Sequence, residues 1–374
     1  MTTGPIETNK DNVVVLDYNL LVAKQVDYSD AIEKAFGSAG DCLGVLVVKN
    51  VPDLQGKREK LLSLASTLGN LPQSVLDKAH DPVTEWFGWD RGTEIFNGRP
   101  DLAKGSFYAN PLYDEPFTDA DIMAKFPALT RPNKWLRDDL PELEPAFKTL
   151  AQLIVRVATL VAMQCDRYAV SRSLASYPSA SYLEDTIATS RVHKGRLLHY
   201  YPLDSLPETY RTAAAAVPAG QIDDNLCGWH LDNSSLTGLT SAIYYRETLD
   251  AATGAVTGLE PVAPPADAGL YIRTRGGETV RVGIPKDCLA FQIGEALEKS
   301  TGGSLRATEH CVFGGSQSDL ARNTLAVFCQ PNVDAPVTKG LNFAQFSQEI
   351  YERNHAKATA DGTQPIVMGG IGAQ

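Results

Sequence analysis

The second half of the chain consists of short runs of β-branched and aromatic residues separated by turn residues at fairly regular intervals. From about residue 190 onward, this pattern predicts short strands rather than helices. Consecutive short strands bury their apolar faces by forming a sandwich or a barrel. The predicted strands are Arg196–Tyr201, Leu226–Asp232, Leu236–Tyr245, Leu270–Thr274, Thr279–Val282, Leu289–Ile293, Arg306–Val312 and Thr324–Gln330.

The rest of the chain favours helices and loops around this β-rich part. Apolar residues recur at helical spacing from Leu143 to about Ala169, which predicts a long scaffold helix, and Asn342–Arg353 has a helical pattern too. Aromatic residues interleaved with glycines over 85–116 predict an ordered loop, which could line a pocket or cover a satellite hydrophobic cluster. Residues 247–268, rich in Ala, Gly and Pro, predict a long surface loop.

These elements predict one compact unit of the α+β class with a mainly β core. Residues 1–190 form an N-terminal helical and mixed region that packs on the core, and residues 191–335 form the core. Residues 336–374 contribute a C-terminal helix and a loose tail.

Charge and cysteine content narrow the classes of partner. The formal net charge of −11 disfavours a protein that binds nucleic-acid backbones, because such proteins carry basic surfaces. No apolar stretch approaches the length needed to span a membrane, so small molecules are the expected partners. The six cysteines are scattered without a Cys-Xaa-Xaa-Cys pair, which favours reduced thiols and a cytoplasmic location. We expect a monomer.

Two histidines and an aspartate in the β-rich half form a candidate metal site. His230 and Asp232 are two residues apart on a predicted strand, so their side chains point to the same face. His310 lies on another predicted strand and could complete a three-ligand set with open coordination positions. Two histidines and one carboxylate arranged in this way are typical of non-haem Fe(II) oxygenases. Taken alone, His310 is more simply interpreted as an ordinary core or surface histidine.

A candidate anion site follows His310 along the chain. Arg322 and Thr324 share a strand face, and a guanidinium binds a carboxylate with two parallel hydrogen bonds. The run that begins at Arg322 looks buried, and a buried arginine needs an anionic partner. A bound dicarboxylate would supply one, although a salt bridge on an edge strand is an alternative. Phe328, on the same face, is either a substrate wall or a core residue.

Together these residues give the chain a resemblance to a known family. It resembles the Fe(II)- and 2-oxoglutarate-dependent oxygenases, in the branch that contains isopenicillin N synthase and the plant flavonoid dioxygenases. The resemblance covers most of the chain and rests on segments 197–202, 230–232, 236–237, 269–270, 293–295, 308–312, 322–324 and 331–332.

The resemblance implies a double-stranded β-helix (jelly roll) flanked by N-terminal helices and a C-terminal helix. It implies that His230, Asp232 and His310 are the catalytic iron ligands. It also implies that Arg322 and Thr324 bind the distal carboxylate of 2-oxoglutarate, with Tyr201 in contact with this cosubstrate. The implied cofactors are Fe(II), 2-oxoglutarate and dioxygen.

Other positions are candidates for the substrate pocket or for recognition of a ligand. Many relatives carry Asn where this chain has His199, which shares a strand face with Tyr201 and could therefore lie at the pocket. Phe107 and Tyr108, from the aromatic segment, are also candidate pocket residues. Four cations could recognise an acidic small molecule or could simply be solvated surface residues. They are Arg91, Lys104, Arg191 and Arg196.

The expected reaction is oxidation of an unactivated C–H bond of a small metabolite, which could carry a carboxylate and belong to specialised metabolism. Hydroxylation, desaturation and oxidative ring closure all remain open, with release of succinate and CO₂. Isopenicillin N synthase keeps an Arg-Xaa-Ser pair, similar to Arg322 and Thr324 here, without using 2-oxoglutarate, so an oxidase of that type is one alternative. A second alternative is a non-catalytic jelly-roll module that binds a small molecule.

Overall fold

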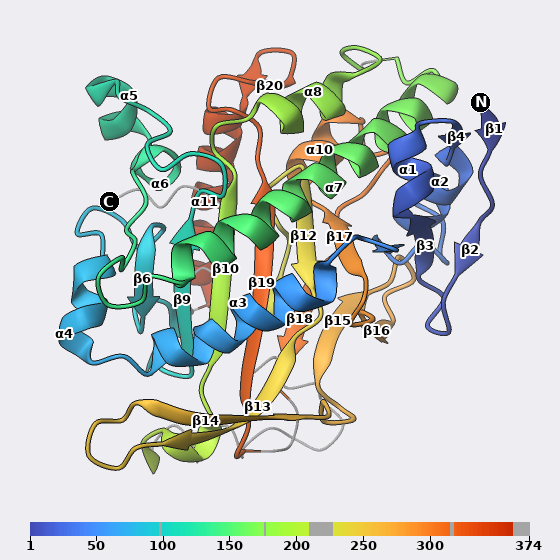
Figure 1. Cartoon of the computed structure of the whole chain (residues 1–374). Coiled ribbons are helices and arrows are strands. Elements are labelled where there is room, and N and C mark those ends of the chain that lie inside the picture. Colours follow the sequence, from blue (N-terminus) through green and yellow to red (C-terminus); the bar gives the residue numbers. More distant parts are fainter. Residues whose placement is uncertain (97–98, 176, 209–226, 315–317, 362–374) are drawn as a thin grey trace.

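Two β-sheets form the centre of the protein. The computed structural model describes residues 1–96, 99–175, 177–208, 227–314 and 318–361 (Figure 1). The larger, 11-stranded sheet has the main order β2-β3-β5-β17-β12-β19-β10-β9-β6, and β13 pairs with both β19 and β14. Its strands are β2 (Glu7–Thr8), β3 (Val14–Asp17), β5 (Val45–Lys49), β17 (Leu289–Ile293), β12 (Leu236–Thr240), β19 (Ala321–Cys329), β10 (Lys194–Tyr200), β9 (Lys104–Ala109), β6 (Gly88–Arg91), β13 (Ile243–Leu249) and β14 (Val256–Val262).

The smaller sheet has four antiparallel strands and packs on the larger one. Its order is β11-β18-β15-β16, with β11 (Cys227–His230), β18 (His310–Phe313), β15 (Gly269–Arg273) and β16 (Thr279–Val282). Buried apolar residues from both sheets meet in one cluster, which includes Val47 and Ala290 from the large sheet and Leu270 and Ile272 from the small sheet. The β-rich part predicted from the sequence is therefore a two-layered core.

Helices cover the other face of the large sheet, which we call its outer face; the face toward the small sheet is its inner face. Figure 1 shows α3 and α7 lying across this outer face. The described part of the chain has the following helices, not all of them on this face: α1 (Tyr18–Ala23), α2 (Ser29–Phe36), α3 (Leu54–Gly69), α4 (Gln73–Leu76), α5 (Ala120–Lys125), α6 (Pro127–Thr130), α7 (Leu143–Ser171), α8 (Tyr182–Thr189), α10 (Glu295–Ser300) and α11 (Phe343–Asp361). Short 3-10 helices are η1 (Asp77–Ala79) and η2 (Leu203–Ser205), and two-stranded pairs are β1 (Thr2–Thr3) with β4 (Val26–Asp27), β7 (Ile95–Phe96) with β8 (Arg99–Pro100), and β20 (Pro336–Thr338) with β21 (Leu341–Asn342).

Helix α7 is the predicted scaffold helix, and it lies very close to the sheet. A Cβ atom at Gly195 of β10 would come within 2.5 Å of the Phe147 ring, and one at Gly238 of β12 within 2.3 Å of Ile154. Glycine at these two positions is what lets the helix approach the strands. By length and composition α7 could cross a membrane, which corrects the expectation from the sequence. In this protein, however, 67% of its most apolar 18-residue stretch is buried inside the fold.

Strands replace two segments that were predicted as loops. Residues 85–116 contain β6 and β9, which extend the large sheet beyond β10, and residues 247–268 contain β14, which pairs with β13. The predicted strand Leu236–Tyr245 is two strands, because β12 ends at Thr240 and β13 begins at Ile243. Strands from residues 1–190 thus belong to the same sheet as strands from residues 191–335.

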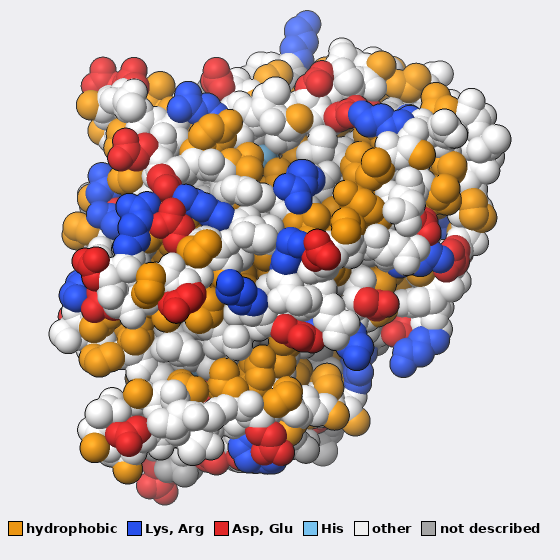
Figure 2. All heavy atoms as spheres, viewed as in Figure 1, with side chains coloured by type: hydrophobic (Ala, Val, Ile, Leu, Met, Phe, Trp, Pro, Cys, Tyr) orange, Lys and Arg blue, Asp and Glu red, His pale blue; other side chains and the backbone are white. Residues whose placement is uncertain are grey.

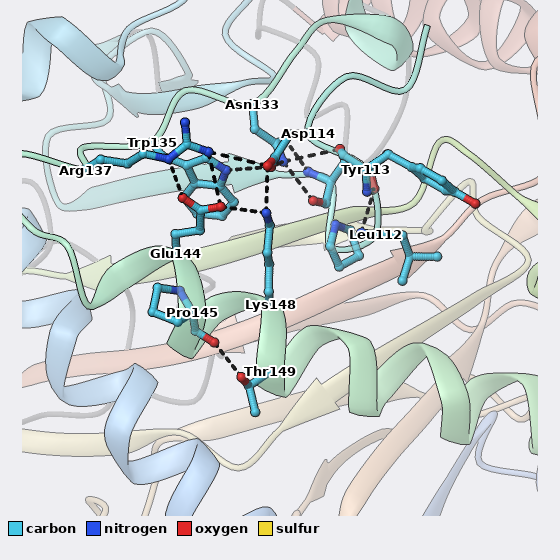
Figure 3. A network of polar contacts seen from close by, with 12 residues as sticks. Leu112, Tyr113, Asp114, Asn133, Trp135, Arg137, Glu144, Pro145, Lys148 and Thr149 are labelled. Atoms are coloured by element: carbon cyan, nitrogen blue, oxygen red, sulfur yellow. Dashed lines mark hydrogen bonds and ion pairs between the residues drawn. The ribbon is translucent and has the colours of Figure 1, made fainter.

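A polar network fixes the segment that follows β9 to the start of α7 (Figure 3). The carboxylate of Asp114 accepts hydrogen bonds from Trp135 at 2.8 Å, from Asn133 at 3.0 Å and from Lys148 at 2.8 Å. Lys148 also donates to Glu144, one helical turn earlier, at 2.6 Å. This network ties the segment after β9 to the first two turns of α7.

The outer face carries charges of both signs. Figure 2 shows Lys and Arg side chains interspersed with Asp and Glu side chains over α3 and α7, with hydrophobic side chains scattered among them. The face shown therefore has no extended region of positive charge.

A buried histidine between α8 and β10 should make the stability of the fold sensitive to acid. His193 is 1% exposed, its Nε2 lies 2.9 Å from the carbonyl oxygen of Ile187, and burial lowers its pKa to about 4. In the unfolded chain His193 binds a proton near pH 6.5. Its contribution to stability is therefore fully present above that pH and decreases as the pH falls toward 4. We expect His193 alone to lower the free energy of unfolding by about 3 kcal/mol between pH 7 and pH 4.

Urea unfolding of the wild type and of His193→Gln at several pH values measures this contribution. The variant should show a shallower loss of stability below pH 6.5, whereas the control His80→Gln, at an exposed histidine, should keep the wild-type slope. Equal slopes for all three proteins would contradict the prediction.

Candidate metal centre

Two histidines lie side by side on neighbouring strands of the small sheet. His230 at the end of β11 and His310 at the start of β18 are direct partners in the antiparallel register, and their ring centroids are 4.2 Å apart. The Nδ1 atom of His230 lies 2.7 Å from the carbonyl oxygen of Gly228, and that of His310 lies 3.0 Å from the carbonyl oxygen of Thr308. Because a carbonyl oxygen only accepts, each Nδ1 carries the hydrogen and each Nε2 keeps its lone pair.

Asp232 completes the group two residues after His230. One of its carboxylate oxygens lies 3.7 Å from Nε2 of His230, and the other lies 3.9 Å from Nε2 of His310. One potential ligand atom from each of the three residues lies within 4.8 Å of the others. These separations are too long for hydrogen bonds, yet all three buried groups point to one centre. The structure therefore brings together the three predicted ligands.

Burial keeps both imidazoles neutral at ordinary pH. It lowers the pKa of His230, and it lowers the pKa of His310 to about 4 with a further contribution from the neighbouring His230. The carboxylate of Asp232 acts in the opposite direction on both rings but is outweighed. A neutral imidazole is the form that binds a metal ion, and its second nitrogen is fixed here by a backbone carbonyl, as is usual in metal sites.

The predicted anion clamp, Arg322 and Thr324, lies on the inner face of β19. Arg322 is 8% exposed, and its Nε and Nη1 atoms have no hydrogen-bond partner among the described residues. Its guanidinium lies 5.1 Å from the centroid of the Tyr200 ring. The hydroxyl of Thr324 makes two long contacts with Thr240, of 3.3 Å to its carbonyl oxygen and 3.4 Å to its hydroxyl. The clamp is therefore a buried cation and a hydroxyl with unused hydrogen-bonding capacity.

One cavity contains both the metal centre and the anion clamp. Its empty volume is about 580 Å³, and its walls come from both sheets. Apolar side chains form most of these walls. The lining residues are Leu198, Tyr200, Cys227, His230, Asp232, Thr237, Leu239, Thr240, Leu270, Ile284, His310, Val312, Arg322, Thr324, Ala326 and Phe328.

Among the predicted pocket residues, only Phe328 lines this cavity. Tyr201 and His199 lie on the outer side of the large sheet, where the Tyr201 hydroxyl donates to the carbonyl oxygen of Gly69 in α3. Phe107 packs against Phe147 of α7 in the outer core. Tyr108 does lie on the inner side, but it packs against Trp86 and away from the cavity. These four placements correct the pocket predicted from the sequence.

Tyr200 takes the position expected for Tyr201. Leu198 and Tyr200 alternate with His199 and Tyr201 along the chain, and it is the first pair that lines the cavity. Tyr200 lies directly opposite Arg322 in the register between β10 and β19. Alternation alone correctly groups each pair on one face but does not indicate which face is inward. The pairing with Arg322 would have identified Tyr200.

Two of the four candidate recognition cations are buried in an ion cluster rather than exposed. Glu94 pairs with Lys104 at 2.6 Å and with Arg196 at 2.5 Å, and Lys104 also lies 3.2 Å from Asp101. Burial would raise the pKa of Glu94, but the two cations outweigh it and lower that pKa to about 2. Arg91 lies over the ring of Tyr201. Arg191 lies near the rings of Tyr113 and Phe117.

Comparison with known proteins identifies the fold. No family model matches the chain, and no curated protein is similar to it in sequence. Among solved structures, a Caulobacter crescentus protein assigned to the 2OG-Fe(II) oxygenase family is similar, with a TM-score of 0.65 and 16% identity over 92% of this chain and 100% of that one. A full-length Neurospora crassa protein, crystallised in complex with alpha-KG and 5-formyluracil, has a TM-score of 0.59 and 18% identity over 87% of each chain.

A plant protein shares the same architecture. The dioxygenase for auxin oxidation 1 of Arabidopsis thaliana, in complex with 2-oxoglutarate, has a TM-score of 0.53 and 16% identity, and the match covers 85% of this chain and 92% of that one. At these identities the likeness shows a common fold. Nearly the whole length of each neighbour is matched, so the fold of this chain is that of these oxygenase structures.

Proposed function

We propose that this protein is an Fe(II)- and 2-oxoglutarate-dependent oxygenase with a double-stranded β-helix core. One observation carries the proposal: the buried guanidinium of Arg322 has two nitrogen atoms without partners among the described residues, in the same cavity as three converging metal ligands. A buried cation without an anion is costly. A dicarboxylate that binds both the metal and Arg322 would satisfy the two halves of the cavity at once.

The donor set fits ferrous iron. Two imidazole nitrogens and one carboxylate oxygen, with the rest of the coordination sphere open to the cavity, are the arrangement used by non-haem Fe(II) oxygenases. When bound, the ion would bring 2-oxoglutarate and dioxygen together for oxidative decarboxylation, so that a substrate C–H bond becomes C–OH while succinate and CO₂ are released. The carbonyl oxygens of Gly228 and Thr308 hold the two imidazoles in the tautomer that this binding requires.

The anion clamp fits the far carboxylate of 2-oxoglutarate. Arg322 would bind it with charge-assisted hydrogen bonds, and Thr324 would donate one more. The Tyr200 ring covers one side of the guanidinium. Leu239, Leu270 and Ala326 provide apolar walls that suit the two methylene groups between the carboxylates.

The remaining cavity favours a small substrate. Leu198, Val312 and Phe328 make its walls largely apolar. The Neurospora crassa protein, which shares the fold, was crystallised with 5-formyluracil, a small molecule. We infer oxidation of a C–H bond in a small metabolite, with hydroxylation as the default and desaturation or ring closure as variants. The isopenicillin N synthase and flavonoid dioxygenase branch, a role in specialised metabolism, a cytoplasmic location and a monomeric state are parts of the same proposal.

Formation of succinate tests the proposal directly. Protein stripped of metal with a chelator should form succinate from 2-oxoglutarate and oxygen only after Fe(II) is added, slowly without substrate and faster when a substrate is present. His230→Ala should reduce this turnover to background. Full turnover by His230→Ala, or binding of 2-oxoglutarate that is unaffected by the chelator, would overturn the assignment. The second result would instead support a metal-independent binding module.

A further inference from the structure

Asn323 lies between the two residues of the anion clamp and points in the opposite direction. Successive side chains of a strand alternate between its faces, so Arg322 and Thr324 enter the cavity while Asn323 faces helix α3. The side chain of Asn323 is fully buried. Its Nδ2 donates to the carbonyl oxygen of Leu62 and to the hydroxyl of Ser66, both in α3 and both at 2.7 Å.

His199 completes this buried arrangement from the neighbouring strand. It lies directly opposite Asn323 in the register, and its Nδ1 is 2.8 Å from Oδ1 of Asn323. Since the amide nitrogen of Asn323 already donates to α3, Oδ1 is the acceptor and Nδ1 of His199 carries the hydrogen. A Cβ atom at Gly69 would lie 2.4 Å from the His199 ring, so the end of α3 rests directly on this histidine. We call these contacts the His199–Asn323 network.

On one side of the clamp the strand pairing of β19 is interrupted, whereas β10 pairs with it continuously on the other side. β12 pairs with β19 only up to Ala326, and β13 resumes the pairing at Asn323. The Thr240 hydroxyl accepts from the amide of Leu325 at 3.1 Å within this gap. Arg58 of α3 donates to the carbonyl oxygens of Ser241 and Ala242, at 2.6 and 3.2 Å.

We propose that Asn323, supported by His199, is a positioning residue for the anion clamp. The network attaches the segment that carries Arg322 and Thr324 to α3, across the sheet from the cavity. It thereby fixes the direction from which the guanidinium meets the distal carboxylate of 2-oxoglutarate. The inference rests on the proposed function and adds a role for two residues that do not touch the cavity.

The affinity for 2-oxoglutarate tests this role. Asn323→Ala removes three hydrogen bonds without changing any cavity residue. We expect its KM for 2-oxoglutarate to rise about tenfold, with kcat at saturating 2-oxoglutarate within twofold of the wild type and with Fe(II) affinity unchanged. The preference for 2-oxoglutarate over 2-oxobutyrate, which lacks the distal carboxylate, should fall by the same factor of about ten.

A matched control separates positioning from general stability. Gln164 is another fully buried amide, which accepts from the backbone of Tyr28 at 3.0 Å and donates to Val26 at 3.2 Å, far from the clamp in sequence. Gln164→Ala should lower the melting temperature as Asn323→Ala does but leave the KM and the preference unchanged. If Asn323→Ala does not fold, Ser66→Ala removes one bond of the same network and should shift the KM in the same direction by a smaller factor.

Two results would overturn the inference. One is a KM and a preference that stay within twofold of the wild type in both network variants; the other is an equal shift in Gln164→Ala. A wild-type protein that does not bind 2-oxoglutarate at all would instead remove the proposed function, and the inference with it. Measuring the wild type first keeps these two failures distinct.

Discussion

Asp232→Ala is expected to weaken binding of Fe(II) by at least about 100-fold. Loss of a group that merely orients a ligand already costs metal sites roughly 10- to 100-fold in affinity, and Asp232 is itself one of the three converging donors. It is also the only donor of the three that carries a negative charge. Anaerobic calorimetric titration of metal-free protein with Fe(II) measures the effect.

The same substitution should not destabilise the metal-free protein. A buried carboxylate beside two neutral imidazoles is costly, because burial removes its hydration and no salt bridge from Lys or Arg offsets this in the described structure. Metal-free Asp232→Ala should therefore melt at or above the temperature of the metal-free wild type, and only the wild type should gain stability when metal is added.

A neighbouring carboxylate provides the control for this prediction. Glu309 precedes His310 but pairs with Arg273 at 2.7 Å on the partly exposed side of the strand. Glu309→Gln should bind Fe(II) as the wild type does. Equal Fe(II) affinities for Asp232→Ala and the wild type would show that the metal binds elsewhere.

The candidate metal centre was only partly predictable from short-range patterns. The period of two predicted that His230 and Asp232 point the same way, and both do reach one centre, although β11 ends at His230 and Asp232 follows it. That His310 lies directly opposite His230 is a matter of strand register, which no local pattern encodes. The residues alone left it open that His310 completes the set with His230, and the family resemblance implied it.

There is a physical reason why the sequence did not reveal which face of β10 points toward the cavity. All seven of its residues are buried, because α3 and α7 cover one face and the small sheet and the cavity lie on the other. A strand buried on both faces lacks the polar and apolar alternation that reveals the inward side. The family resemblance implied that Tyr201 contacts the cosubstrate, and the pattern of β10 gave no sign that Tyr200 is the residue at the cavity.

Strand β14 was missed for the opposite reason, because it is exposed rather than buried. It pairs only with β13, and each of its residues is at least partly exposed, so selection for apolar side chains is weak. The burial of Lys104 and Arg196 could not be predicted either, since it depends on ion pairs with Glu94 and Asp101 in a neighbouring loop. Long-range ion pairing leaves no periodic signal in a sequence.

Arg322→Met is expected to raise the dissociation constant for 2-oxoglutarate by about 100-fold. Truncating one partner of a buried, hydrogen-bonded charge pair costs about 2–5 kcal/mol, and about 3 kcal/mol corresponds to two orders of magnitude. Methionine keeps most of the apolar stem and removes the charge. Anaerobic calorimetry with Co(II) in place of Fe(II) measures binding without turnover.

A monocarboxylate and a melting curve make the Arg322 prediction specific. The wild type should prefer 2-oxoglutarate over 2-oxobutyrate by about 100-fold, and Arg322→Met should bind both alike, because only the distal carboxylate meets the clamp. Without ligand, the variant should be at least as stable as the wild type, since it removes a buried guanidinium whose Nε and Nη1 lack partners in the described structure. An unchanged preference in a folded variant would mean that Arg322 does not bind the cosubstrate. That result would support the alternative of an oxidase of the isopenicillin N synthase type, whose cavity has a metal centre and needs no dicarboxylate site.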